Sequence, residues 1–392
     1  MNLILENVTM PFGPLPAGHV EMADGRIAAV VPATDRPPKG RRLALDGALV
    51  FPGLINSHDH LAFNAFPPLG EGPYRNFLDW SRDIHRRFSQ IIARVKQIPL
   101  PVRVGWGMLK NLLCGVTVVA HHGAWPAGAS NRPIGLVAGS QSLHSLALER
   151  HWRWKLLFPE LFAGGRREWP VVVHLAEGVD AARERELPQL VRWNWRRRPL
   201  IAVHGIALKP GQAGHLRALV WCPVSNLYLY GATAPVSQLK RETTILLGSD
   251  ATLTGSWNFW EHLRQARALG QLDDQMLFQA VTASAARVWQ LPGGHIAPGG
   301  PADLVVARRV KADPVEAFFA LNPTDILLVM RSGRAVLWDA ELDERMAALG
   351  YRAAAEGWLN LAGRKKWVAL NVADLLRNTP PDLLPLPIAK AG

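Results

Sequence analysis

Short apolar runs alternate with helix-like stretches through the middle of the chain, and this alternation constrains the fold more than any other feature. Such runs are typical of a parallel sheet that helices cover. A further strand fits within residues 134–148, a stretch long enough to hold two. Eight strands close a barrel, so the sequence predicts an α/β fold with a (β/α)8 TIM-like barrel over residues 51–302. The runs are FPGLINSHDH (51–60), GVTVVAHH (115–122), LVAGSQSLHSLAL (136–148), VVVHLAE (171–177), LIAVHGIAL (200–208), LVWCPVSN (219–226) and TILLGSDA (244–251).

The two ends of the chain carry a different pattern. Residues 1–50 and 303–345 contain short β-branched runs that Gly, Pro and charged residues separate, as in a small antiparallel sheet. Ser332-Gly333 is a predicted tight turn between two of these runs. We expect the two segments to form one small β-sandwich domain. Residues 346–392 are predicted to form a C-terminal helix and a proline-rich tail that lies on the surface or crosses to a partner.

Length and composition narrow the class of protein. The chain has 392 residues, which a barrel with a small appendage would absorb. No window is apolar for long enough to span a bilayer, and the first ten residues lack the basic start of a signal peptide. Cys114 and Cys222 lie far apart in apolar stretches, where we expect them to fill core space. The sequence therefore predicts a cytoplasmic protein with no membrane partner, and it leaves a homo-oligomer open.

The net charge of +12 raises the question of a nucleic-acid partner. The densest basic stretch, residues 183–198, contains six arginines together with Trp193 and Trp195. Glu184 and Glu186 interrupt this charge, and arginine stems on a helix can cover apolar surface. We therefore favour a structural role for this stretch over a nucleic-acid interface.

The first predicted barrel strand ends in two histidines. Side chains alternate along a strand, so His58 and His60 share one face while Asp59 points to the other. Two imidazoles placed in this way can chelate one divalent metal ion, and the strand holds them rigidly.

Later strands end in further candidate ligands. His174, His204 and Asp250 each follow an apolar run, and in a barrel they would point into the same mouth. Imidazoles with one carboxylate suit a divalent ion such as Zn²⁺, with Fe²⁺ as the second choice, and this ion would lower the pKa of a bound water to about 7. Glu177 follows His174 by three residues and could deliver a proton to a leaving group.

These motifs together resemble the amidohydrolase superfamily. Within it they are most similar to the mononuclear-metal branch of cytosine, guanine and S-adenosylhomocysteine deaminases and triazine hydrolases. PGLINSHDH looks like the first-strand motif of that family, and HLAE, VHG, CPVSN and GSD follow in the order of its fifth to eighth strands. IAPGGPADLVV (296–306) is similar to the family's return from barrel to sandwich. The resemblance covers nearly the whole chain.

The resemblance implies a role for each strand-end residue. His58, His60, His174 and Asp250 would bind the metal, and His204 would orient or activate the water. Glu177 would shuttle protons, and Asp250 would also take the proton of the activated water. The binuclear branch fits less well, because it needs a lysine after the fourth strand. Here no lysine lies between Lys110 and Lys155, and Lys155 is in a helical context.

Substrate contacts are predicted from position alone. His122 closes the second strand, His144 lies near the fourth, and Ser225 and Asn226 close the seventh, so all four could reach a bound ligand. Residues 67–85 carry three aromatic side chains and could form a lid that excludes water. A loop with a small core of its own is the equal alternative. The stretch between His122 and His174 is shorter than in most deaminases of this group. We therefore do not assign the substrate of any named deaminase to this protein.

The sequence thus predicts a metal-dependent hydrolase of non-peptide C–N bonds that acts on a small molecule. Hydrolytic deamination of an N-heterocyclic compound is the leading version. Hydrolysis of a cyclic amide, or removal of another leaving group from a heterocycle, would use the same residues. A non-catalytic or nucleic-acid-binding barrel is the alternative from a different class, although such a protein would be expected to lose ligands.

Overall fold

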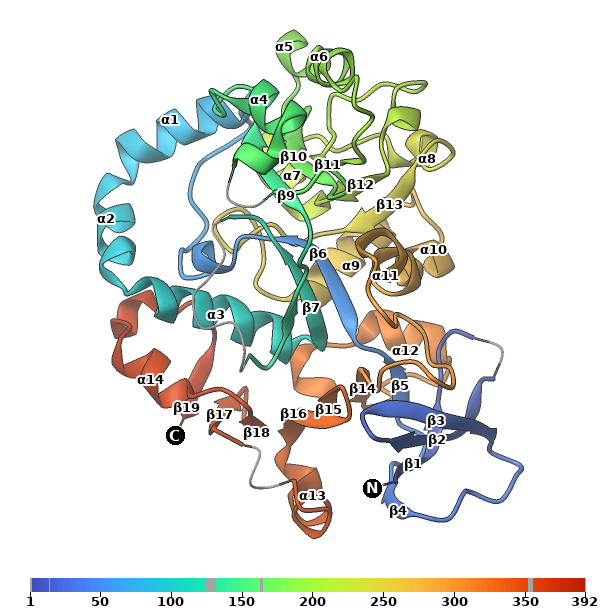
Figure 1. Cartoon of the computed structure of the whole chain (residues 1–392). Coiled ribbons are helices and arrows are strands. Elements are labelled where there is room, and N and C mark those ends of the chain that lie inside the picture. The colour runs from blue at the N-terminus through green and yellow to red at the C-terminus, as the bar shows by residue number, and fades with distance from the viewer. Residues whose placement is uncertain (1, 14, 124–131, 163–164, 352–354, 392) are drawn as a thin grey trace.

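The central strands form two parallel sheets. The computed structural model of this chain describes residues 2–13, 15–123, 132–162, 165–351 and 355–391. One sheet has the strand order β6-β7-β8 and the other the order β13-β12-β11-β10-β9 (Figure 1). The eight strands are β6 (Leu54–Asp59), β7 (Val116–His121), β8 (Gly135–Leu136), β9 (Gln141–Ser145), β10 (Val171–Leu175), β11 (Leu200–His204), β12 (Ala218–Trp221) and β13 (Thr244–Leu247). The expectation of two strands within residues 134–148 is confirmed by β8 and β9.

The two sheets meet where β6 and β13 end. The backbone N–H of Asp250 donates to the carbonyl of His58 over 3.0 Å, and the N–H of His60 donates to the carbonyl of Asp250 over 2.8 Å. No strand pairing joins β8 to β9 within the described residues. The fold is therefore an α/β arrangement like that of a TIM barrel, with a hydrogen-bonded seam beside the strand ends of β6 and β13.

Burial on both faces explains why the central strands are so apolar. All five residues of β10 and all five of β11 are buried, as expected for parallel strands that are covered on both faces. The helix α3 (Leu100–Leu113) is buried at every position from 104 to 113. The other helices of this region are α1 (Phe77–Arg87), α2 (Ser89–Gln97), α4 (Trp152–Leu157), α5 (Ala181–Glu184), α6 (Glu186–Trp193), α7 (Pro223–Tyr230), α8 (Val236–Leu239), α9 (Phe259–Ala268), α10 (Asp274–Ala280) and α11 (Ala283–Trp289).

Both ends of the chain contribute to one eleven-stranded mixed sheet. Its order is β19-β17-β18-β16-β15-β14-β5-β1-β2-β3, with β4 paired to β1. β14 pairs antiparallel with β5, so residues 1–50 and 303–345 contribute strands to one mixed sheet. The small β-sandwich domain expected from these two segments stays a prediction. Ser332 and Gly333 form the turn between β15 and β16, as predicted. The strands are β1 (Leu3–Thr9), β2 (Ala17–Ala23), β3 (Arg26–Pro32), β4 (Arg41–Ala44), β5 (Leu49–Pro52), β14 (Leu304–Ala307), β15 (Ile326–Arg331) and β16 (Arg334–Asp339), and the helix α12 (Pro314–Ala320) follows β14.

The C-terminal segment differs from the prediction of a helix and a surface tail. The helix α13 ends early (Asp343–Ala348), and β17 (Gly357–Leu361), β18 (Arg364–Val368) and β19 (Ile388–Ala391) extend the mixed sheet, with α14 (Val372–Arg377) between them. Ala362 and Gly363 both have positive φ, of 48° and 85°, which suits the two-residue turn of a β-hairpin. Alternate residues of β17 are buried, and this alternation fixes its register in the sheet.

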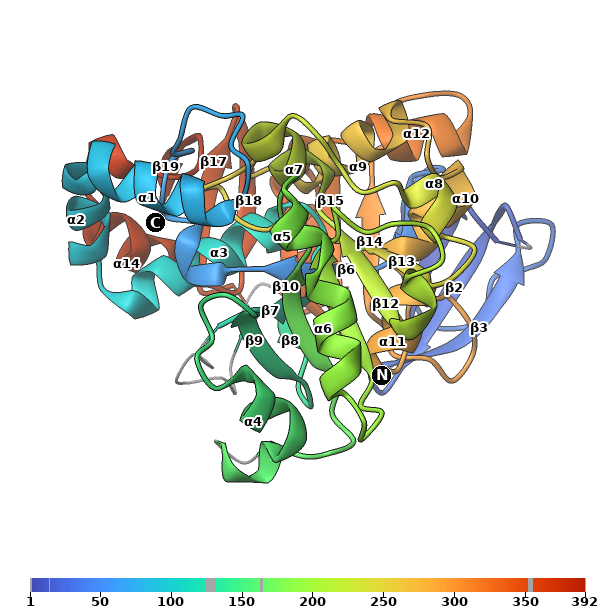
Figure 2. The same cartoon turned by 90° about the horizontal axis from the view of Figure 1, so that it is seen from above.

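The mixed sheet lies at the lower end of the molecule and α5 and α6 lie at the upper end, with the parallel strands between them (Figure 1). Seen from above, β2 and β3 lie on the opposite side from α1 and α2 (Figure 2). Cys114 and Cys222 are both buried and free, which confirms their expected place in the core. Among the helices of the described residues, none combines the length and apolarity that crossing a bilayer would need.

Candidate metal centre and active site

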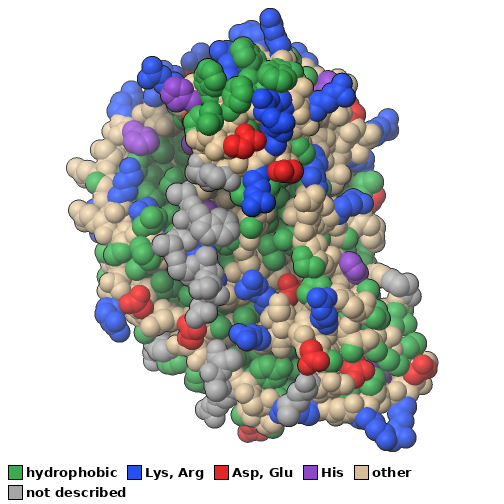
Figure 3. Space-filling view, viewed as in Figure 1, with side chains coloured by type: hydrophobic (Ala, Val, Ile, Leu, Met, Phe, Trp, Pro, Cys, Tyr) green, Lys and Arg blue, Asp and Glu red, His purple; other side chains and the backbone are tan. Residues whose placement is uncertain are grey.

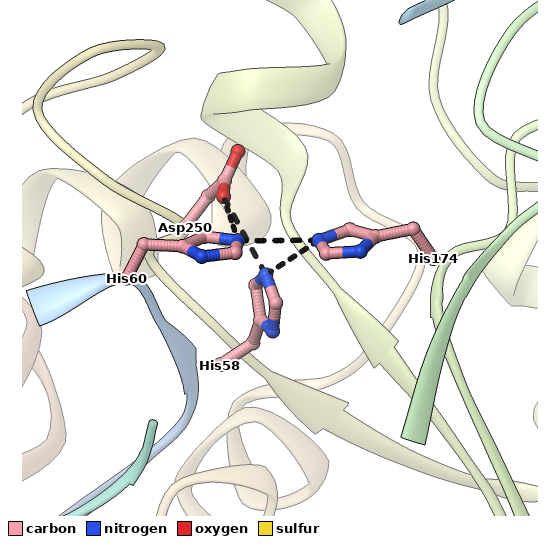
Figure 4. Close-up of side chains that lie close together, drawn as sticks. All are labelled: His58, His60, His174 and Asp250. Carbon is pink, nitrogen blue, oxygen red and sulfur yellow. Dashed lines mark hydrogen bonds and ion pairs between the residues drawn. The ribbon is translucent and has the colours of Figure 1, made fainter. Parts of the chain in front are cut away.

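Four side chains from three strand ends converge on one point. The Nε2 atom of His174 lies 3.2 Å from that of His60 and 3.2 Å from that of His58. The Asp250 Oδ1 atom lies 3.5 Å from His58 Nε2 and 3.6 Å from His60 Nε2 (Figure 4). Nitrogens bound to zinc at 2.0–2.1 Å with tetrahedral angles lie roughly 3.3 Å apart. The donor set of these four residues therefore fits one metal ion.

Local backbone geometry turns these side chains inward. Asp250, three residues after the last residue of β13, has a φ of 63°, and His204 at the end of β11 has a φ of 72°. Non-glycine residues rarely adopt such angles, and those that do cluster at functional sites. Asp59 points away from the four converging side chains and into the protein, so the predicted alternation along β6 is confirmed.

Hydrogen bonds leave the converging atoms free to bind a cation. His174 Nδ1 donates to the carbonyl of His144 over 2.6 Å, so Nε2 carries the lone pair. The second carboxylate oxygen of Asp250 accepts bonds from the hydroxyls of Ser225 and Thr254, each over 2.7 Å. These bonds direct Oδ1 toward the histidines.

Burial sets the protonation states that a metal site requires. Burial and the neighbouring His58 lower the pKa of His60 to about 3, and burial also lowers the pKa values of His58 and His174. Burial opposes ionisation of Asp250, but its hydrogen bond with His58 and the nearby histidines bring its pKa well below the usual range. Neutral imidazoles beside an ionised carboxylate are the forms that coordinate metals.

Glu177 and His204 lie together at the edge of the metal centre. His204 Nε2 is 3.7 Å from Glu177 Oε1, and both residues are buried. His204 Nδ1 donates to Asn226 Oδ1 over 2.9 Å, which leaves Nε2 as an acceptor facing the site. Tyr230 donates its hydroxyl to Glu177 Oε1 over 2.7 Å. Burial raises the pKa of Glu177, while His204 and Tyr230 oppose that rise.

The residues predicted to contact substrate fall into two groups. His122 is buried with its ring centroid 4.4 Å from that of His174, and its two ring nitrogens have no hydrogen-bond partner among the described residues. His144 is exposed, with its ring 5.4 Å from that of His174. Both rings lie beside His174, and their contact with a substrate stays a prediction.

The prediction for Ser225 and Asn226 needs correction. Both are fully buried: Ser225 bonds to Asp250, and the side-chain amide of Asn226 bonds to His204 and to Thr233. Their polar atoms are engaged by Asp250, His204 and Thr233 instead of being free to meet a substrate. Sequence reasoning missed Tyr230, which lies four residues after Asn226 in α7. That helical spacing places the two side chains on one face and could have revealed it.

The structure also describes the segment that was predicted to form a lid. Residues 67–85 contain a loop and most of α1, whose Asn76 side chain caps the helix by accepting from the N–H groups of Leu78 and Asp79. Whether this segment closes over the site stays a prediction.

Lys155 lies in α4 and pairs with Glu149 over 3.0 Å, so it is a helical residue as predicted.

The arginine-rich stretch has structural contacts at both of its ends. Arg183 is buried, pairs with Glu186 over 2.7 Å and stacks over Phe77. Arg198 is buried and donates to Gln141 Oε1 and to four backbone carbonyls. Lysine and arginine side chains are spread widely over the face shown in Figure 3. These contacts agree with the structural role that the sequence predicts for Arg183 and Arg198.

Comparison with known proteins finds a family model and several relatives that are similar to this chain. The model of the Amidohydrolase family matches residues 195–336. A 5-methylthioadenosine/S-adenosylhomocysteine deaminase of Symbiobacterium thermophilum is 25% identical over 82% of this chain and 89% of that protein. An imidazolonepropionase of Klebsiella pneumoniae is 51% identical, but only over 14% of this chain and 13% of that protein.

Solved structures share the fold. An adenosine deaminase from Xanthomonas campestris with bound zinc superposes with a TM-score of 0.67 at 19% identity, covering 85% of this chain and 92% of that one. An atrazine chlorohydrolase from Arthrobacter aurescens complexed with zinc gives a TM-score of 0.65 at 17% identity, covering 85% and 95%. The sequence match over residues 195–336 and this shared fold show that the chain resembles the amidohydrolase superfamily.

Proposed function

We propose that this protein is a metal-dependent hydrolase that deaminates an N-heterocyclic small molecule with water. The observation that carries the proposal is the convergence of three imidazole nitrogens and one Asp250 oxygen within 4.8 Å of one another, with four of the separations between 3.2 and 3.6 Å. In this proposal His58, His60, His174 and Asp250 hold one divalent ion, with Zn²⁺ as the first choice because zinc is bound in the similar structures. Such an ion supplies Lewis-acid activation of water.

The residues beside the ion carry the proton transfers. Glu177, held by Tyr230, accepts one proton of the attacking water and delivers it to the departing nitrogen, which leaves as an amine or ammonia. His204 accepts a hydrogen bond through Nε2 and so orients the water. Asp250, as an ionised carboxylate, accepts the second proton of the water when the product carbonyl forms and passes it to the ring nitrogen of the product. His122 and His144 are proposed to contact the substrate.

The names of similar proteins narrow the substrate class. The relative from Symbiobacterium thermophilum deaminates adenine-containing compounds by its name, and the zinc-containing Xanthomonas structure is an adenosine deaminase. We therefore propose a ring carbon that bears an exocyclic amine as the point of attack. The chlorohydrolase among the similar structures favours one second candidate, in which the same residues remove another leaving group from a heterocycle.

The domain division supports a catalytic barrel over residues 51–302. The site residues all lie within this range, and the eleven-stranded sheet contributes none of them. We propose that residues 1–50, 303–345 and the C-terminal strands form a supporting domain.

The experiment that tests this function measures metal content and ammonia release together. Protein purified without added metal should contain about one zinc per chain, and it should release ammonia from at least one member of a panel of amino-substituted purines, pyrimidines and triazines. Release of chloride or of an alkylamine from substituted triazines would support the second candidate. Two metals per chain, or none after incubation with zinc, would overturn the mononuclear site.

A further inference from the structure

A buried polar network lies directly behind the proposed metal centre. At its middle, Asp59 forms an ion pair with Lys110 over 3.0 Å, with the two side chains 0% and 1% exposed. Buried charges are costly unless they are paired and hydrogen-bonded. The six members of the network, each at most 1% exposed, are Asn56, Asp59, Asn64, Lys110, Asn111 and Ser249.

The Asp59 carboxylate is saturated with donors. Its Oδ2 atom accepts from Lys110, from the Asn111 amide over 2.8 Å and from the Ser249 hydroxyl over 3.2 Å. Its Oδ1 atom accepts from the Asn64 amide over 2.6 Å. Lys110 also donates to Asn64 Oδ1 over 2.8 Å and to Ser249 Oγ over 3.1 Å. The pair therefore joins β6, the turn after it, α3 and the segment after β13.

The same network touches the backbone of the metal ligands. Asp59 stands between His58 and His60 in the chain, and Ser249 directly precedes Asp250. Asn56 Oδ1 accepts from the N–H of Ser249 over 3.1 Å, while the carbonyl of His58 accepts from the N–H of Asp250 over 3.0 Å. Because both strand ends are tied to one buried charge pair, any displacement of that pair changes the distance between their ligands.

We propose that Asp59 and Lys110 are positioning residues that set the separation of His58 and His60 from Asp250. The inference rests on the proposed function, because it assumes that these ligands bind one metal. Neither positioning residue contacts the metal site itself. Their contribution is to make the donor set rigid before the ion arrives, so that less ordering is required on binding.

A purely electrostatic role makes a different prediction. Lys110→Met would leave the Asp59 charge near the cation and strengthen zinc binding, whereas Asp59→Asn would leave the lysine charge and weaken it. A positioning role predicts the same sign for both substitutions, because each breaks the same set of hydrogen bonds. The direction of the change in zinc affinity therefore separates the two roles.

The chain offers a matched control for the general cost of breaking a buried ion pair. Lys366 in β18 pairs with Asp339 in β16 over 2.8 Å, with exposures of 0% and 5%. It also donates to the carbonyls of Thr324 and Ile326. This pair lies in the eleven-stranded sheet, outside the metal centre. Lys366→Met should lower thermal stability and leave zinc affinity unchanged.

The test measures zinc affinity by competition with a chromophoric chelator, and the visible spectrum of the Co²⁺-substituted protein. Lys110→Met and Asp59→Asn should each weaken zinc binding by about 10- to 100-fold, the range for residues that support metal ligands. Both should also shift the cobalt absorption bands, whereas Lys366→Met should do neither. If either variant fails to fold, Asn111→Ala takes its place in the test. This substitution removes one donor to Asp59, and it should also weaken zinc binding.

The possible results distinguish a failure of the proposed function from a failure of the positioning role. If the unaltered protein binds no zinc, the proposed function fails. If the unaltered protein binds zinc but Lys110→Met binds it equally well or more tightly, the positioning role is overturned while the metal site stands. A loss of affinity in Lys366→Met equal to that in Lys110→Met would also overturn it, because general destabilisation would then explain both.

Discussion

The Tyr230 hydroxyl donates a hydrogen bond of 2.7 Å to Oε1 of Glu177, the residue proposed to carry the proton to the leaving group. Tyr230 is buried at the end of α7, and its own pKa is raised by burial and by the nearby Glu177. The phenol therefore stays protonated and acts as a donor. Because a donor stabilises the ionised form of its acceptor, Tyr230 keeps the pKa of Glu177 lower than burial alone would.

Replacement of Tyr230 should move the pH profile of the reaction. In Tyr230→Phe the carboxylate loses this donor, so the pKa of Glu177 rises further above its usual value. The acid limb of kcat/KM should therefore move to higher pH, because Glu177 must be ionised before it can accept a proton. Tyr228→Phe is the control, since the Tyr228 hydroxyl donates to the carbonyl of Gly70 instead. An unchanged acid limb in Tyr230→Phe would argue against this role.

Glu177→Gln should separate metal binding from turnover. Glutamine keeps the shape of the side chain but cannot transfer the proton, so kcat should fall by roughly 10² to 10⁴. Zinc content, measured by elemental analysis, should stay at that of the unaltered protein because Glu177 is not among the four converging ligands. A variant with full turnover would remove Glu177 from the mechanism, and one without zinc would make it a ligand.

Much of this site follows from the sequence because strand ends are easy to recognise. An apolar β-branched run stops where the chain leaves the barrel, and His174, His204 and Asp250 stand at such points. Alternation along β6 gave the opposite directions of His58 and Asp59. These are local rules, and they need no knowledge of the other strands.

The supporting residues could not be placed in the same way. Lys110 lies in α3, 51 residues after Asp59, and only the packing of that helix against β6 brings the two together. Ser225 and Asn226 follow a strand, but the first turn of α7 carries them beneath Asp250 and His204. The C-terminal strands were missed because a proline-rich composition hides the pairing of β19 with β17, which depends on a partner far along the chain.

Arg198 should matter for stability far more than its exposed neighbour Arg197. Its guanidinium donates to Gln141 and to four carbonyls, which lose this donor in Arg198→Met. Unsatisfied buried polar groups cost about 1–3 kcal/mol each, so the free energy of unfolding should fall by at least about 2 kcal/mol. Arg197→Met should change it by less than about 0.5 kcal/mol. Equal effects in urea unfolding would contradict the structural assignment of this arginine.

His262 provides a pH-dependent term in stability that is independent of the metal centre. It is buried in α9, where Nε2 bonds to the carbonyl of Ser256 over 2.9 Å, and burial lowers its pKa to about 4. The unfolded chain binds a proton here below about pH 6.5, while the folded protein does so only near pH 4, so stability is lost as the pH falls through this window. His262→Gln should abolish that term, which amounts to about 2 kcal/mol between pH 7 and pH 5. Urea unfolding of zinc-loaded protein at both pH values measures it, with the exposed His85→Gln as control. If the two variants show the same pH dependence as the unaltered protein, His262 titrates alike in the folded and unfolded states and its burial has no such effect.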